Sequence, residues 1–140
     1  MDRHFWECLS SLGNPYMEKI RISCEGRTFF AQLNAFQSSR KIWDALPIKS
    51  CVNTWGDEIY FEIPVSCGVE NGYAKETVEL GDVGYWPKGK CFCIFFGMTP
   101  MSKKGKIRPA STVNVLGKID GGLKELKKVR DGSEISMERL

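Results

Sequence analysis

Histidine is nearly absent from this sequence, and its scarcity excludes several kinds of catalytic site. His4 is the single histidine, and it stands near the N-terminus, outside the strongly patterned part of the chain. Ser-His-Asp and Cys-His mechanisms both require an imidazole as general base. We therefore predict no catalytic residue of either kind.

Metal-binding patterns are missing as well. None of the six cysteines forms a CxxC pair. Cys91 and Cys93 would share one face of a strand, but zinc takes about four ligands and one histidine cannot complete the set. We predict no metal and no cofactor, and we expect the cysteines to be free thiols that are buried as small apolar side chains.

No apolar run in the chain is long enough to cross a membrane. The longest, CFCIFFGM at 91–98, falls far short of the ~20 residues that a spanning helix needs. The N-terminus, MDRHFWECLSSLG, has an acid at position 2 and lacks the apolar core of a secretory signal. We therefore expect a cytoplasmic protein without a membrane partner.

Repeats, low-complexity segments and linkers are also lacking, which favours one domain. A chain of 140 residues can bury roughly two-thirds of its unfolded surface, which is enough for a single core. The net charge of +3 is unevenly distributed, because residues 101–130 carry nine basic residues against Asp120 and Glu125. Such a segment can attract phosphate backbones, but no aromatic residue is interleaved with it to stack on bases. Nucleic-acid binding through residues 103–130 is therefore only a third interpretation.

Alternating apolar residues dominate the chain and predict β-structure. Ile20, Ile22 and Cys24 alternate with polar residues before a Glu25-Gly26 turn, and the alternation then resumes, as in a β-hairpin. Asn71-Gly72 is the strongest hairpin-turn signal. The predicted strands are 19–24, 27–33, 48–54, 58–65, 78–86, 91–97, 113–119 and 133–140, and the strands at 48–54 and 58–65 are expected to pair about Trp55-Gly56-Asp57.

Helical patterns are few and short. Residues 2–13 are consistent with a short helix capped by Asp2, and Ser38 or Ser39 is expected to cap a helix that Pro47 ends. Asp120 can cap a third helix through Leu126 and Val129. Because successive strands follow one another through turns, an antiparallel barrel with helices at its open ends satisfies the pattern best.

The run GDVGYWPKGKCFCIFFG, followed by TP, IRPAS and VNVLGKI, resembles the signature of the small prokaryotic cyclophilin-like proteins of unassigned function. This resemblance implies a closed antiparallel eight-stranded barrel with two short capping helices, formed by residues 19–140. Residues 1–18 would be an N-terminal extension. A fold does not fix a function, and working cyclophilins carry an arginine in an FHR-type strand and a stretch ending QGGD, which this chain lacks. No catalytic residue can be carried over.

The residues favour a barrel that binds a peptide or small molecule in an aromatic cleft without strong catalysis. Peptidyl-prolyl isomerase activity is the enzyme alternative. It would need an apolar wall and a donor for the twisted amide, and arginine suits the donor because it stays charged. Each candidate also has a plainer interpretation, as a core aromatic or a solvated loop residue. The predicted ligand-binding residues are Trp55, Tyr60, Tyr85, Trp86, Phe96, Met98 and Arg108.

Two further motifs do not predict a site. Gly84 to Lys90 has the spacing of a phosphate-binding loop, but Cys91 stands where Ser or Thr should hold magnesium, and it begins a strand rather than a helix. Glu58 and Glu62 are a possible carboxylate pair. Alternation sends both to the same face, which we expect to be solvated, so paired-carboxylate catalysis is not predicted.

Overall fold

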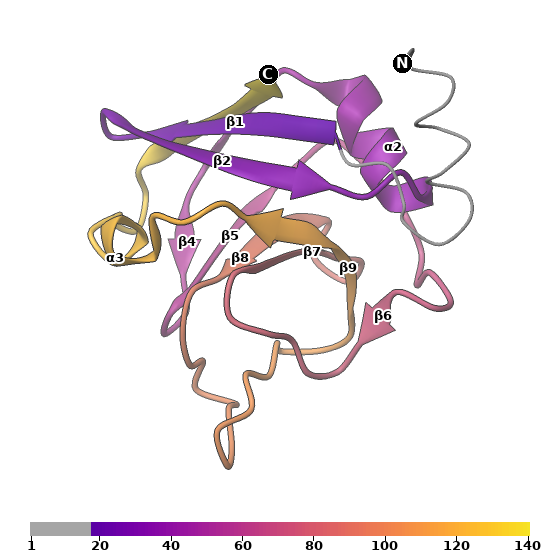
Figure 1. The fold of residues 1–140 in the computed structure, drawn as a ribbon, viewed down its shortest axis with the longest axis vertical. Helices are drawn as coiled ribbons and strands as arrows, with labels where there is room; N and C mark the ends of the chain where they lie inside the picture. The colour runs from indigo at the N-terminus through magenta and orange to yellow at the C-terminus, as the bar shows by residue number, and fades with distance from the viewer. Residues whose placement is uncertain (1–17) are drawn as a thin grey trace, which may run out of the picture.

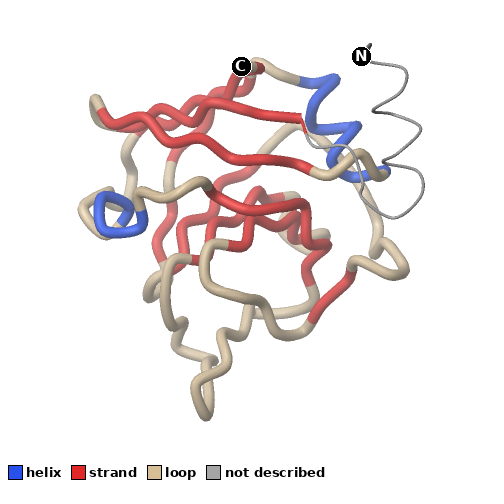
Figure 2. The backbone as a smooth tube through the Cα atoms, in the orientation of Figure 1, coloured by secondary structure: helices blue, strands red, loops and turns tan. Residues whose placement is uncertain are grey.

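The computed structural model describes residues 18–140 and shows a mainly β protein (Figures 1 and 2). The helix predicted at 2–13 and the N-terminal extension lie outside the described residues, apart from Glu18, which begins the first strand. The strands are β1 (Glu18–Cys24), β2 (Arg27–Leu33), β3 (Ile48–Cys51), β4 (Asn53–Thr54), β5 (Glu58–Glu62), β6 (Ala74–Lys75), β7 (Asp82–Trp86), β8 (Cys91–Phe95), β9 (Val113–Ile119) and β10 (Glu134–Arg139). Two short helices, α2 (Gln37–Ala45) and α3 (Leu123–Leu126), lie on opposite sides in the view of Figure 2.

Nine strands follow one another in a nearly closed antiparallel barrel. Their order is β3-β10-β1-β2-β9-β7-β8-β5-β4, and β6 pairs separately with β9. The two ends of this path, β3 and β4, are separated in the chain by Val52 alone. The family resemblance implied a closed barrel of eight strands, whereas this barrel has nine strands and is nearly closed. The segment 48–54, which was expected to be one strand, forms two. The division falls at Val52, whose backbone bonds to Gly132 and Ser133, at 2.7 and 2.8 Å, while the next residues, Asn53 and Thr54, pair with β5.

The hairpin predicted from the alternation after Lys19 is confirmed. β1 pairs with β2 in a register that joins Cys24 to Arg27. The two turn residues, Glu25 and Gly26, have φ values of 52° and 76°. Left-handed conformations at both central positions match the twist of the flanking strands, which is why a glycine is favoured here.

The turn at Asn71-Gly72 exists, but it does not join two neighbouring strands. The segment before it is held by Asn114 of β9, whose side chain accepts a hydrogen bond from the Glu70 N–H at 2.8 Å and donates one to the Gly68 carbonyl at 2.9 Å. A side chain therefore satisfies the backbone groups that a strand partner would otherwise satisfy. The hairpin prediction was wrong for this reason.

Helix α2 was expected, but its cap was not. Phe36 is the N-cap residue and makes no side-chain capping hydrogen bond. Ser38 and Ser39 are buried within the first turn rather than preceding it. The Ser38 N–H and hydroxyl both donate to the Glu70 carboxylate, at 3.0 and 2.7 Å. A distant acid thus satisfies a free amide of the helix N-terminus.

Helix α3 is shorter than the sequence predicts. Its N-cap is Gly122, with φ of 74°, and not Asp120. A Cβ at Gly122 would lie 3.0 Å from a ring carbon of Phe29, so the chain passes too close to β2 for a larger residue. Val129 is buried beyond the end of the helix.

The side chains form two apolar clusters, one on each face of the same strands. The larger fills the barrel and includes Ile59, Phe61, Tyr85 and Phe92. The smaller lies on the outer face of β7, β8 and β9 and is partly covered by Val78 and Ile107 from the connecting loops. Its buried members are Val78, Cys91, Cys93, Phe95, Ile107 and Val113. The loop between β8 and β9, orange in Figure 1, runs out from the barrel and returns.

The five described cysteines carry free thiols. Cys24, Cys91 and Cys93 are buried as predicted, whereas Cys51 is exposed. Within residues 18–140, no His, Cys, Asp and Glu side chains gather in a set of three or more that could hold a metal ion. No described helix is long and apolar enough to cross a membrane.

Candidate functional site

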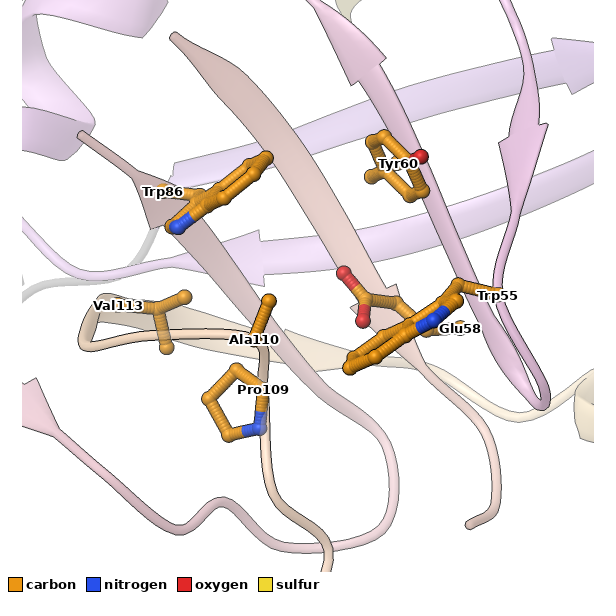
Figure 3. Close-up of a pocket in the computed structure, with 7 residues that line it drawn as sticks. All are labelled: Trp55, Glu58, Tyr60, Trp86, Pro109, Ala110 and Val113. Carbon is orange, nitrogen blue, oxygen red and sulfur yellow. The ribbon is translucent and has the colours of Figure 1, made fainter. Parts of the chain in front are cut away.

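A hollow of about 250 Å³ lies on the outer wall of the barrel. It sits over strands β5, β7 and β8 and under the loop that joins β8 to β9. Three aromatic residues, one acid and three small or medium apolar residues line it: Trp55, Glu58, Tyr60, Trp86, Pro109, Ala110 and Val113 (Figure 3). This hollow, rather than the open end of the barrel, is where three of the predicted aromatic residues meet.

The register of the strands produces the hollow. Tyr60 of β5 pairs with Cys93 of β8, which pairs with Gly84 of β7. One row across the outer face thus runs from a large side chain through a small one to none. A Cβ at Gly84 would lie 3.3 Å from a methyl carbon of Val113, so the missing side chain also lets β9 pack closely.

Trp86 and Tyr60 form two walls that meet at nearly a right angle. Their ring centroids are 6.1 Å apart and their planes are inclined by 85°. The indole of Trp86 is fixed, because its Nε1–H donates to the Ser111 hydroxyl at 2.6 Å. Gly89 lies under the same ring, and a Cβ there would come within 2.5 Å of it. The wall is therefore held in position before any ligand arrives.

Trp55 forms the third aromatic wall from the turn between β4 and β5. Its backbone N–H donates to the Glu58 carbonyl at 2.9 Å, and the Glu58 N–H donates back at 3.2 Å. Gly56 has φ of 60°, and a Cβ there would lie 2.8 Å from the Met98 carbonyl oxygen. The Asp57 N–H donates to that same oxygen at 2.8 Å. The turn is thus packed tightly against the start of the long loop.

The long loop supplies Pro109 and Ala110, and it is anchored before them by the contacts below and after them by the bond between Ser111 and Trp86. Ile107 is buried and forms an isolated bridge with Val78. The Thr99 hydroxyl donates to the Arg108 carbonyl, and the Arg108 N–H donates to the Ser102 hydroxyl at 3.2 Å. These contacts hold the loop over the sheet, so the hollow has a defined roof.

Glu58 is the one ionisable carboxyl that lines this hollow, and it is buried. The residue is only 5% exposed, and its Oε1 has no hydrogen-bond partner in the part of the chain that the structure describes. Burial raises the pKa of this carboxyl to about 7, and an interaction with the Cys93 thiol offsets a smaller part of the shift. The expectation of a solvated face for both acids was therefore wrong for Glu58, whereas Glu62 is exposed.

The close-up shows how Glu58 is placed. Its carboxylate points toward the space that the rings of Trp55, Tyr60 and Trp86 surround (Figure 3). Buried polar groups in folded proteins are nearly always hydrogen-bonded, so an acceptor without a partner beside an open hollow requires an explanation. Oε1 is enclosed by protein, but the carboxyl of Glu58 borders the hollow, where a cation from a bound molecule would stabilise its ionised form.

Of the seven predicted ligand-binding residues, three line this hollow and four do not. Trp55, Tyr60 and Trp86 line it. Tyr85 is fully buried in the barrel, where its hydroxyl donates to the Val65 carbonyl at 2.6 Å. Phe96 also belongs to the inner cluster.

Met98 and Arg108 lie on the long loop but are absent from the lining of the hollow. Met98 is exposed and Arg108 is half-buried. Both contribute backbone groups that position the loop. A role of their side chains in binding stays a prediction.

Sequence reasoning missed Glu58, Pro109, Ala110 and Val113. For Glu58 a signal was present, because alternation along β5 puts it on the same face as Tyr60. What alternation does not show is that a loop covers this face. The other three residues could be found only once the path of that loop was known.

A second hollow of about 480 Å³ lies beside β6 and β9. Four charged residues line it, and three of them pair with one another. Lys118 Nζ lies 2.9 Å from Asp82 Oδ1 and 3.1 Å from Glu79 Oε1. Its main charges therefore have partners, so the smaller aromatic hollow is the better candidate.

Comparison with known proteins establishes the family. Residues 18–138 match the family described as cyclophilin-like, so the chain belongs to the cyclophilin-like family. The solution structure of a hypothetical protein from Archaeoglobus fulgidus is similar, with 44% sequence identity and a TM-score of 0.75. The match covers 91% of this chain and 98% of that one. No curated protein matches. The relative is itself described as hypothetical, so the similarity identifies a fold and no activity.

Proposed function

We propose that this protein binds a small molecule, or one side chain of a peptide, in the hollow on its outer wall. The observation that carries the proposal is a preformed aromatic enclosure around a buried carboxyl whose Oε1 lacks a partner. Ligand sites are typically apolar with a few placed polar groups, and this hollow has that composition. It offers no arrangement of nucleophile and base, so strong catalysis is not part of the proposal.

Two of the four tryptophans line the hollow, which gives a direct test. Binding of a fragment or peptide should change the fluorescence of Trp55 and Trp86, and the Trp86→Ala variant should bind at least tenfold more weakly, or about 1.4 kcal/mol. Trp43→Phe is the matched control, because Trp43 lies on α2 against Arg139 and not in the hollow. A broad set of small molecules and peptides that leaves the fluorescence unchanged would contradict the proposal.

Prolyl isomerisation is the second candidate, and it is proposed by analogy of fold with the cyclophilins. An apolar hollow can grip a proline ring, but no arginine lines it. The predicted donor, Arg108, is therefore tested separately: Arg108→Ala should weaken binding of a proline-containing peptide with little change in melting temperature. A protease-coupled assay whose rate equals that of the buffer would remove the candidate.

Nucleic-acid binding through residues 103–130 has less support. Several of these basic residues already pair with acids, including Lys118 with Asp82 and Lys128 with Glu125. Such pairing reduces the charge available to phosphates. Retention on heparin that disappears at moderate salt would favour this function, because phosphate contacts release counterions.

A further inference from the structure

We infer that the ligand of the outer hollow is a small organic ammonium ion, a protonated amine that carries at least one N–H and compact apolar substituents. The inference rests on the proposed function and narrows it to one chemical class. Three features of the hollow favour this class: its ring faces, its carboxyl and its size.

The aromatic rings of the hollow favour a compact cation. Trp55, Tyr60 and Trp86 enclose one space from three elements, and the last two stand at nearly a right angle. The face of an aromatic ring carries negative charge density, and tryptophan attracts cations most strongly. Rings set at an angle can contact a compact cation on more than one side. A flat neutral ligand would be matched better by parallel rings.

The carboxyl of Glu58 favours a positively charged ligand. Within residues 18–140, Glu58 is the only residue of the lining whose side chain can carry a charge near pH 7, and its buried Oε1 has no donor among them. Oε1 is enclosed by protein, but an ammonium N–H could donate a charge-assisted hydrogen bond, which is stronger than a neutral one, to the part of the carboxylate that borders the hollow. No described lysine or arginine lines the hollow to compete for the acid. The cation must therefore come from outside the lining.

The volume of the hollow and the charges around it favour a small cation. At about 250 Å³, the hollow lies below the ~300–1,000 Å³ of sites for drug-sized ligands, so it suits a compact head group. The other titratable groups near Glu58 are Tyr60 on its own strand and Cys91 and Cys93 on β8. Burial raises the pKa of all three, so they stay neutral near pH 7. Pro109, Ala110 and the two indoles add no charge.

Three probes of nearly equal shape separate the contributions. They are protonated N,N-dimethylethanolamine, which has a charge and an N–H, choline, which has only the charge, and 3,3-dimethyl-1-butanol, which has neither. Calorimetric titration at pH 8 should give the tightest binding for the amine and the weakest for the alcohol. The charge alone should contribute roughly 2- to 30-fold.

Glu58→Gln provides the matched variant, with Glu62→Gln on the same strand as its control. The first should weaken amine binding by tenfold or more and leave the alcohol unchanged, whereas the second should change neither. Choline keeps its charge at every pH, so its binding to the unmodified protein reports on the acid alone. Its affinity should fall from pH 8 to pH 5 by up to the roughly 2- to 30-fold that the charge contributes, because protonation of Glu58 removes the attraction between the two charges.

The outcomes separate this inference from the proposed function. Equal affinity for all three probes, or a choline affinity independent of pH, would overturn the ammonium assignment while leaving a binding hollow. The same conclusion would follow if none of the three probes bound while other molecules changed the fluorescence of Trp55 and Trp86. If no molecule of any class changes that fluorescence, the proposed function fails and the inference fails with it.

Discussion

The two faces of strand β5 differ in how completely their side chains fill space. Inward, Ile59 and Phe61 are fully buried, and Phe61 stacks on Phe92 with ring centroids 5.4 Å apart. Outward, Glu58 and Tyr60 alternate with them but border a hollow. One strand therefore contributes to a close-packed core on one side and to an open, polar-tipped site on the other.

This difference assigns stability to the inner face of the barrel and the proposed binding site to its outer face. A packed interior has no room for a ligand, and its residues are constrained by volume. The outer face is covered by a loop rather than by a second layer, and a hollow remains between that loop and the aromatic residues of the sheet. The prediction of an aromatic cleft mixed the two faces, because it included Tyr85 and Phe96 from the interior.

The inner face should show the largest loss of stability. Phe61→Ala removes a ring from a fully enclosed site and is expected to cost ~3–5 kcal/mol in the free energy of unfolding, measured by urea denaturation. Its neighbour Tyr60→Ala should cost only about 1 kcal/mol while abolishing ligand binding. Equal losses for the two variants would break the comparison between the faces.

Glu58 should make stability depend on pH. Its pKa of about 7 in the folded protein lies above the ordinary 4.5, so the folded state retains a proton that the unfolded chain releases. Stability is therefore highest at low pH with respect to this group and declines as pH rises from about 4.5 through 7, by at most ~3 kcal/mol.

Melting temperatures at pH 5 and pH 8 measure this effect. Glu58→Gln should flatten the difference and raise the melting temperature at pH 8. Glu62→Gln, on the exposed end of the same strand, should leave the pH dependence as it is. A Glu58→Gln variant with an unchanged pH profile would show that this carboxyl is solvated.

Gly89 should matter through the position of Trp86. Gly89→Ala places a methyl group 2.5 Å from the indole carbons, which is expected to displace the ring and cost ~1–3 kcal/mol. Tryptophan fluorescence and urea denaturation together report on both effects. Gly68→Ala is the control, because no heavy atom would lie within 4 Å of its Cβ. An unmoved fluorescence spectrum would mean that Trp86 is not held by this contact.

The smallest effect on stability is expected at the roof of the hollow. Ala110 is exposed, and Ala110→Leu should change the free energy of unfolding by no more than ~0.5 kcal/mol. The larger side chain should nevertheless occupy the hollow and prevent binding. Lys106→Leu adds the same side chain elsewhere on the loop and should leave binding intact. Binding that survives Ala110→Leu would place the ligand somewhere else.

Local patterns predicted individual strands well and helix caps poorly. The 19–33 hairpin and the strand at 113–119 were found because alternation and turn residues act over a few positions. The caps of α2 and α3 were assigned to Ser38 or Ser39 and to Asp120, whereas the structure places Phe36 and Gly122 there. A contact from Glu70 replaced the local cap, and no local pattern can show such a contact.

The sequence by itself determined that the chain forms an antiparallel barrel, because period-two alternation fixes which side chains face inward whatever the strand order. Only the tertiary structure decided the site. The hollow depends on the register that sets Tyr60 beside Cys93 and Gly84, and on a loop that brings Pro109 over Glu58. These are contacts between residues distant in the chain, and their geometry follows from how strands pair and loops pack rather than from any local spacing.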